Sequence, residues 1–297
     1  MSRNTRPQIL LAAFLATLCL APLAVPAAPS TSKLATTKPA ISKPATPKPT
    51  APKPAVAKTT TIAMRFANYG HAGMWLLQHD GGTPQVLHGA DRAAMPLRPA
   101  STFKVFLALL ALETGTLRGA DEVVPWDGKR YPKQPEWEKD MALREAMQSS
   151  SENYFGTLAD RIGHDRLAAW VARAGYGNGR IGEVPAKAWL DGVLTVTGHQ
   201  QLEFVERLRR NDLPFSAKTI AAVKAAMLDE TIGSRRVYGK TGTLEGNAWW
   251  IGWVEGGKAP AASFALGVEL KATVDGREKR IALGKQLLRD AGVLPAK

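Results

Sequence analysis

A serine and a lysine three residues apart form the first group in this chain that could carry nucleophilic chemistry. Ser101 precedes Lys104, and an apolar run continues to Leu112. A serine at a helix N-terminus lies where free backbone N–H groups and the helix dipole favour a developing negative charge. Burial in an apolar helix favours the neutral lysine, which can accept a proton. The spacing alone is weak evidence, because Ser30 and Lys33 share it where no function is expected. On this motif alone, an ordinary helix N-cap is the preferred interpretation of Ser101.

A second group is the Lys-Thr-Gly-Thr sequence at residues 240–243, directly after a strand-like run at residues 236–238. On an edge strand, Lys240 and Thr241 would point into a cleft, and Gly242 would let a substrate approach the backbone closely. The alternative is a solvated turn.

A third group comprises the serines at residues 149–151, Tyr-Gly-Asn at 176–178 and Trp-Leu-Asp-Gly at 189–192. A hydroxyl between a nucleophile and a leaving group can relay a proton, and a tryptophan-bearing loop can shield a base from water. In isolation, a serine-rich helix cap and a core tryptophan are the favoured interpretations of these residues.

Taken together, the order and spacing of these motifs resemble the class D (oxacillinase-type) serine β-lactamases. The resemblance covers residues 62–297 and includes Pro-Ala-Ser-Thr-Phe-Lys at 99–104, Trp-Asp-Gly at 126–128 and Tyr-Gly-Lys-Thr-Gly at 238–242. It implies four catalytic residues and five that bind the substrate or the modified lysine: Ser101, Lys104, Ser150 and Lys240, and then Thr241, Gly242, Thr243, Arg280 and Trp189.

The resemblance also implies a role for each of these residues. Ser101 would be the acylated nucleophile, and Lys104 would react with CO2 to form a carbamate that acts as general base. Trp189 would donate its indole N–H to that carbamate. Ser150 would relay protons, and no other cofactor and no metal is expected. Water would then hydrolyse the acyl-enzyme.

Substrate binding is likewise implied by the resemblance. Lys240, Thr241 and Arg280 would bind the carboxylate of a β-lactam, and the backbone N–H groups of Ser101 and Thr243 would form an oxyanion hole. Arg280 stands twelve residues before the Gly-Val-Leu sequence at 292–294 and is preferred to Arg277 for this role.

One position departs from the family pattern. The Ser-x-Val triplet of the family falls on Ser150-Ser151-Glu152, so a carboxylate replaces an apolar side chain near the lysine. A charge there would disfavour a carbamate unless it were paired or turned away. Shifting the register by one gives Ser151-Glu152-Asn153, the Ser-x-Asn form of class A enzymes, penicillin-binding proteins and sensor domains, so either Ser150 or Ser151 could be the relay.

The predicted fold class is α+β, with an antiparallel sheet built from strands at both ends of the chain and an all-helical subdomain inserted between them. A hairpin is expected at residues 74–78 and 85–88. Further strands are expected at 236–238, 248–254 and 263–270, and helices at 102–112, 141–147, 153–162, 166–174, 198–210, 217–228 and 278–291.

The N-terminal region differs from the rest of the chain. An apolar run from Ile9 to about Val25 follows Arg3 and Arg6, which predicts a cleaved secretory signal at residues 1–27 and a periplasmic or secreted protein. A retained membrane anchor is the alternative. Residues 28–61 are rich in Ala, Thr, Pro and Lys and are expected to form an extended tether. The tether could associate weakly with an anionic envelope surface or have no partner.

Composition excludes several function classes. The chain carries 39 Lys and Arg against 26 Asp and Glu, but residues 1–61 hold eight of the basic residues and no acid. The remaining net charge is too small to indicate a nucleic-acid partner. The only cysteine is Cys19, so a disulfide framework or a cysteine nucleophile is excluded for the domain, and the five histidines show no metal-ligand spacing.

The sequence therefore predicts an enzyme that hydrolyses the β-lactam ring of penicillin-type antibiotics. The alternative is a sensor or transpeptidase-like protein that is acylated but deacylates slowly. A third hypothesis is a non-catalytic envelope-binding protein, whose function would lie in the tether. Class A chemistry is disfavoured, because the loop at residues 183–187 reads Glu-Val-Pro-Ala-Lys and lacks a Glu-x-x-Leu-Asn motif.

Overall fold

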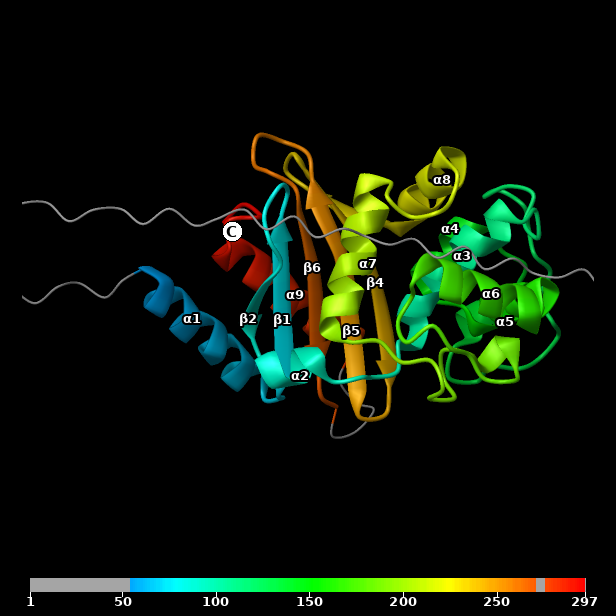
Figure 1. Ribbon diagram of the computed structural model, residues 1–297, viewed down its shortest axis with the longest axis horizontal. Helices are drawn as coiled ribbons and strands as arrows, with labels where there is room; N and C mark the ends of the chain where they lie inside the picture. The colour runs from blue at the N-terminus through cyan, green and yellow to red at the C-terminus, as the bar shows by residue number, and fades with distance from the viewer. Residues whose placement is uncertain (1–53, 271–275, 297) are drawn as a thin grey trace, which may run out of the picture. The chain divides into compact units, whose positions relative to one another are not determined.

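The computed structural model describes residues 54–270 and 276–296 (Figure 1). The expected signal at residues 1–27 and the first part of the expected tether, residues 28–53 of 28–61, lie outside the described residues, as do residues 271–275. No helix in the described part is long and apolar enough to cross a membrane.

Within the described residues, six strands form one antiparallel sheet in the order β2-β1-β6-β5-β4-β3. The strands are β1 (Gly73–His79), β2 (Gln85–His88), β3 (Leu228–Ile232), β4 (Arg235–Leu244), β5 (Asn247–Glu255) and β6 (Ala262–Val268). Because β1 pairs with β6 along its whole length, the N-terminal hairpin is continuous with the C-terminal strands. The predicted sheet built from both ends of the chain is confirmed.

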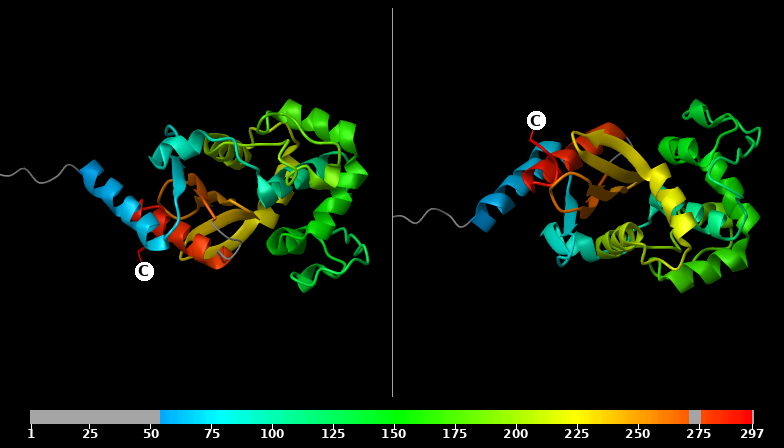
Figure 2. Two further views of the ribbon diagram at one scale, coloured as in Figure 1. Left: turned by 90° about the horizontal axis from the view of Figure 1, so that it is seen from below. Right: turned by 90° about the horizontal axis from the view of Figure 1, so that it is seen from above.

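The helices are α1 (Pro54–Tyr69), α2 (Ala90–Ala94), α3 (Lys104–Glu113), α4 (Leu143–Ser149), α5 (Glu152–Ile162), α6 (His164–Ala174), α7 (Gly198–Arg210), α8 (Ala217–Met227) and α9 (Arg277–Asp290). Short 3-10 turns are η1 (Ala100–Phe103), η2 (Pro135–Trp137) and η3 (Pro185–Lys187). Helices α1 and α9 lie together on one face of the sheet, α7 covers the other face, and α3 to α6 form the inserted helical part (Figures 1 and 2).

Strand β5 shows how a continuous apolar run serves both faces of the sheet. Successive side chains point to opposite faces. Trp249, Ile251 and Trp253 therefore join the core under α7 and the inserted helices. Trp250 and Val254 join the core beneath α1 and α9.

Helix α3 is the central helix of the inserted part. All residues from Lys104 to Ala111 are buried, and α3 packs on both α5 and α8. This confirms the prediction of a helix that is apolar on nearly every side. It also places Lys104 in the interior of the larger core.

Helix α1 and strand β3 are among the elements that were not predicted, as is the short helix α2. Helix α1 begins at Pro54, inside the segment expected to be an extended tether, so the extended conformation does not hold from there to residue 61. Proline suits the first position of a helix, and Ile62 and Phe66 give α1 a buried face on the sheet. Strand β3 was missed because its five residues follow α8 without a break, and Leu228 had been included in the helix.

Candidate active site

The predicted nucleophile lies in a tightly held turn between the sheet and α3. Ser101 is half-buried in η1, directly before the start of α3 at Lys104. Thr102 Oγ1 donates to Pro99 O (2.7 Å) and accepts from the buried Gln201 Nε2 (2.8 Å). Ala100 adopts a positive φ of 50°, a conformation that costs a non-glycine residue energy. The surrounding bonds therefore fix the direction in which Ser101 is presented.

Lys104 is fully buried in an aromatic cage. Its Nζ lies 5.6, 5.9 and 5.7 Å from the ring centroids of Trp137, Phe155 and Trp189. Burial lowers the pKa of Lys104 to about 7, although the nearby Glu152 carboxylate acts in the opposite direction. A large fraction of Lys104 is consequently a neutral amine near pH 7.

The polar contacts of Lys104 differ in one respect from expectation. Nζ donates to Ser150 O (2.6 Å) and approaches Ser150 Oγ at 3.5 Å. Within the described residues, no hydrogen bond joins Nζ to Ser101 Oγ, although the i, i+3 spacing had suggested direct reach. Nζ is instead directed toward the end of α4, where Ser150 O accepts its hydrogen bond.

Ser150 connects two buried lysines. Lys240 Nζ donates to its Oγ at 2.8 Å, and Lys104 Nζ approaches the same oxygen at 3.5 Å. Ser150 terminates α4 in the left-handed conformation with φ of 57°. That conformation costs a serine energy, and here it turns the hydroxyl between Lys104 and Lys240.

The neighbouring Ser151 and Asn153 stabilise the local fold through hydrogen bonds to residues other than the two lysines. Ser151 caps α5, its Oγ accepting from Tyr154 N at 3.2 Å. Asn153 Oδ1 accepts from Asp127 N at 3.2 Å and so holds the Trp-Asp-Gly loop. Of the two registers left open by the sequence, the geometry therefore brings Ser150 and not Ser151 to the lysines.

Strand β4 supplies the other wall of the site. Strand β3 pairs with β4 only as far as Tyr238, so from Gly239 to Leu244 the described β4 pairs with β5 alone. The predicted edge-strand position of Lys240 and Thr241 is thus found, although β4 is longer than the three residues expected. Both side chains are buried. Burial, reinforced by Lys104 and two arginines, lowers the pKa of Lys240 well below its usual value.

A glycine is needed at position 242 for a reason other than the one expected from the sequence. A Cβ at this position would lie 2.9 Å from Pro99 O and 3.1 Å from Ser101 N. The glycine therefore lets the strand approach the nucleophile turn itself, whereas the sequence had suggested room for a substrate.

Arg280 and Arg277 occupy contrasting environments on α9. Arg280 is fully buried and its Nη2 donates to Thr243 Oγ1 at 3.0 Å. Arg277 is exposed and donates to Gln148 O at 3.0 Å. Arg280 therefore lies beside Thr243, in the part of β4 that β3 does not cover.

Trp189 closes the site from the loop that follows η3. It is 1% exposed, and its Nε1 has no hydrogen-bond acceptor in the described part of the chain. A buried N–H without an acceptor is unusual and needs an explanation. Tyr176 packs against Phe103, with ring centroids 5.2 Å apart, and Asn178 Nδ2 donates to Val193 O (2.8 Å). The Tyr-Gly-Asn motif therefore supports the Trp189 loop.

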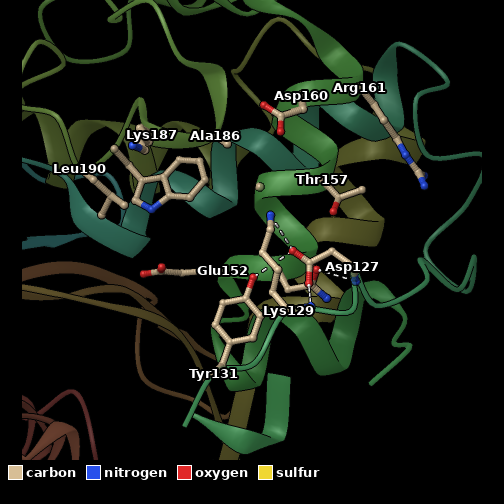
Figure 3. A pocket seen from close by; sticks show the side chains of 13 residues that line it. Asp127, Lys129, Tyr131, Glu152, Thr157, Asp160, Arg161, Ala186, Lys187 and Leu190 are labelled. Atoms are coloured by element: carbon tan, nitrogen blue, oxygen red, sulfur yellow. Dashed lines mark hydrogen bonds and ion pairs between the residues drawn. The ribbon is translucent and has the colours of Figure 1, made fainter. Parts of the chain in front are cut away.

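A cavity of about 630 Å³ adjoins the lysine cage and shares Trp189 with it. Glu152, half-buried at the start of α5, also lines this cavity. In Figure 3 its side chain points away from Asp127 and Lys129, which pair with each other at 3.0 Å. Glu152 makes no ion pair with another described residue, and Lys104 is the lysine whose pKa it raises.

Comparison with known proteins gives a consistent result. The penicillin-binding protein transpeptidase domain family matches residues 88–289. β-Lactamase OXA-5 of Pseudomonas aeruginosa is 37% identical over 200 residues, covering 65% of this chain and 74% of that protein. The chain belongs to the class D serine β-lactamases.

Two further relatives extend the comparison of this class D enzyme. The crystal structure of a class D β-lactamase from Nostoc superposes with a TM-score of 0.73 at 32% identity, covering 78% of this chain and 99% of that one. The regulatory protein BlaR1 of Bacillus licheniformis is 35% identical over 195 residues, which is 64% of this chain and 32% of BlaR1.

Sequence reasoning about this β-lactamase missed several residues that shape the site. Trp137 and Phe155 complete the lysine cage, and Gln201 holds the nucleophile turn. Each lies 33 or more residues from Lys104 in the chain, and an aromatic or amide residue gives no local signal for such a role. No group of three or more His, Cys, Asp or Glu that could hold a metal occurs among the described residues.

Proposed function

We propose that this enzyme hydrolyses the β-lactam ring of penicillin-type antibiotics through an acyl-enzyme on Ser101. The observation that carries the proposal is the convergence of two buried lysines on Ser150 Oγ, beside the nucleophile turn and the open edge of β4. Such a pair of amines with depressed pKa values can move protons near neutral pH.

In acylation, Ser101 Oγ attacks the β-lactam carbonyl carbon and loses its proton to a neighbouring base. The carbon–nitrogen bond of the ring then breaks, and the departing nitrogen receives a proton through Ser150 and Lys240. The backbone N–H groups of Ser101 and Thr243 would stabilise the oxyanion. Lys240, Thr241 and Arg280 would bind the substrate carboxylate, with Gly242 allowing the strand its close position.

The surroundings of Lys104 fit modification by CO2. A neutral amine is required, and the pKa of about 7 supplies it. The Trp189 N–H without an acceptor offers a hydrogen bond to a new oxygen beside Lys104. Once carboxylated, Lys104 would supply the general base that activates water in deacylation.

We further propose that the protein is exported to the periplasm or secreted, since residues 1–27 have the pattern of a secretory signal. The lysines recurring through residues 28–58 would give weak electrostatic association with an anionic envelope, weakened by salt. Determining the N-terminus of the mature protein tests cleavage, and an uncleaved chain would contradict it.

The proposed reaction is tested by following intact mass after mixing with a penicillin. A penicilloyl adduct that forms and disappears with release of the opened product is expected. A persistent adduct would instead support the sensor or transpeptidase-like alternative. Complete absence of an adduct would contradict covalent catalysis by Ser101.

The base is tested separately. Activity should fall in CO2-depleted buffer and recover when bicarbonate is added, and ¹³C-bicarbonate should give a carbamate signal on Lys104. Activity indifferent to bicarbonate, with no such signal, would remove the modified lysine while leaving the acyl-enzyme intact.

A further inference from the structure

Arg98 stands three residues before Ser101 and joins three segments of the chain. Its Nη1 donates to Leu190 O (3.3 Å) and its Nη2 donates to Glu245 O (3.2 Å). Its own backbone O accepts from the side chains of Asn247 (3.2 Å) and Trp249 (3.0 Å). The last two bonds fix the backbone of Arg98 on the sheet, so that its side chain extends from an immobilised base.

The two carbonyls that Arg98 contacts belong to two different segments that border the active site. Leu190 directly follows Trp189, whose indole lies beside Lys104. Glu245 follows Thr243 by two residues, in the turn between β4 and β5. One guanidinium therefore links the wall that encloses the lysine with the strand that lines the substrate side.

The other backbone hydrogen bonds near Trp189 either stay within its own loop or lie several residues farther along the chain. Leu190 N and Asp191 N both donate to Lys187 O, within the loop itself. The loop is next joined to the nucleophile segment at Val196, whose N–H and C=O both bond Leu97. Arg98 acts between these points, one residue from the indole.

We propose that Arg98 is a positioning residue that holds the Trp189 indole against Lys104 and the Thr243 end of β4 against Ser101. The proposal rests on the proposed function, in which the Trp189 N–H binds the carboxylated Lys104. Arginine suits the task because its planar fork can donate to two carbonyls at once, whereas a lysine ammonium acts as a single point.

The expected consequence is a specific change in the enzyme rather than general loss of activity. Without Arg98, the indole N–H is held less firmly, so carboxylation of Lys104 requires more bicarbonate. The substrate side loosens as well, so KM for a penicillin rises. The chemical groups are all still present, so kcat at saturating bicarbonate changes by less than about twofold.

Three variants separate these effects. Arg98→Met keeps the apolar stem and removes the donors, and Arg98→Lys keeps the charge and one point of contact. The matched control is Arg207→Met, because Arg207 is also half-buried and also donates to two backbone carbonyls, those of Ala174 (3.0 Å) and Asp212 (3.4 Å), on a helix that does not carry the catalytic groups.

The experiment measures carbamate formation with ¹³C-bicarbonate, steady-state constants at several bicarbonate concentrations, and the ¹⁹F signal of Trp189 in protein labelled with 5-fluorotryptophan. Arg98→Met is expected to raise the bicarbonate concentration for half-maximal carboxylation about fivefold, the equivalent of one hydrogen bond. It should raise KM two- to threefold and shift or broaden the Trp189 signal. Arg98→Lys should be intermediate, and Arg207→Met should change none of the three.

Unchanged carboxylation, KM and ¹⁹F signal in Arg98→Met would overturn the proposal. So would equal changes in Arg98→Met and Arg207→Met, since these would show only a loss of stability. If the wild-type enzyme itself shows no carbamate, the proposed base fails, and the ¹⁹F signal and KM then decide on Arg98 without it.

Discussion

The two faces of the sheet carry cores of similar chemistry but different purpose. Under α1 and α9, Trp75, Trp250 and Phe264 pack against one another, with ring centroids of the last two 4.4 Å apart. On the opposite side, Trp137, Phe155 and Trp189 surround the amine of Lys104. Large aromatic side chains therefore pack on other rings in both cores, and in the larger core they also enclose a titratable group.

The difference shows that burial has two separate effects in this protein: it stabilises the fold, and it changes the pKa of a buried amine. Beneath α9, removal of apolar surface from water simply stabilises the fold. Around Lys104, the same removal disfavours the ammonium and lowers its pKa to about 7. The catalytic side consequently loses stability to gain reactivity, and substitutions on the two sides should have different signatures.

The largest effect is expected for Ser101→Ala. This substitution removes the oxygen that forms the acyl-enzyme, so hydrolysis should fall by at least about four orders of magnitude. Because Ser101 is only half-buried, the free energy of unfolding should change by less than about 1 kcal/mol. Mass spectrometry after penicillin treatment checks the adduct, and a penicilloyl group on this variant would refute the assignment.

Lys104→Met should abolish turnover but stabilise the protein by roughly 2–4 kcal/mol near pH 6, because it removes a buried charge. The pKa of Lys104 is depressed in the folded state, so between pH 7 and the unfolded value near 10.5 the unfolded state binds more protons. Wild-type stability therefore rises with pH in that window, and the advantage of the variant should narrow by roughly 2–3 kcal/mol from pH 7 to pH 9.

Denaturant unfolding in CO2-depleted buffer at several pH values measures this effect. Stability curves for wild type and Lys104→Met that run parallel between pH 7 and pH 9 would contradict a depressed pKa. The comparison uses the unmodified lysine, because carboxylation would add its own dependence on pH.

Gly284→Ala tests the other face. A Cβ at this position in α9 would clash with the indole of Trp250. Overpacking should destabilise the protein by about 1–3 kcal/mol while the pH profile of activity stays unchanged. Ala282→Val, at an exposed position of the same helix, is the control. A shifted pH profile in Gly284→Ala would show that the two cores are not independent.

The smallest effect is expected for Glu152→Val. Glu152 raises the pKa of Lys104, and the neutral amine is the form present above that pKa. Removing the carboxylate should therefore move the acid limb of the activity profile to lower pH, by up to about one unit, and lower the bicarbonate requirement by up to tenfold. Asp160→Asn, an exposed carboxylate of the same helix lining the same cavity, is the control.

Two results would change the interpretation of Glu152. Identical profiles for wild type and Glu152→Val would show that the carboxylate does not influence Lys104 in solution. Loss of deacylation with acylation preserved would show that Glu152 itself activates the water, which would replace Lys104 as the proposed base.

Much of the fold could be predicted from local patterns. Helix α7 was predicted over its full length, and in the structure Thr197 and Gln200 form a capping box at its start. The strand pattern of residues 248–254 was equally clear. Strand β3 and helix α1 could not be predicted, because short strands and proline-rich helix starts depend on the surfaces that cover them.

The candidate site also has features that the sequence indicated and features that only the tertiary structure showed. The types, order and spacing of the residues indicated the family, and the resemblance to that family supplied the proposed nucleophile, the two lysines and the preference for Arg280 over Arg277. Only the tertiary structure decided between Ser150 and Ser151, because a left-handed residue at the end of α4 turns one hydroxyl toward both lysines while the other caps α5. It also supplied the cage around Lys104 and the bridge made by Arg98, since both join residues far apart in the chain, and distance in space leaves no mark on local sequence.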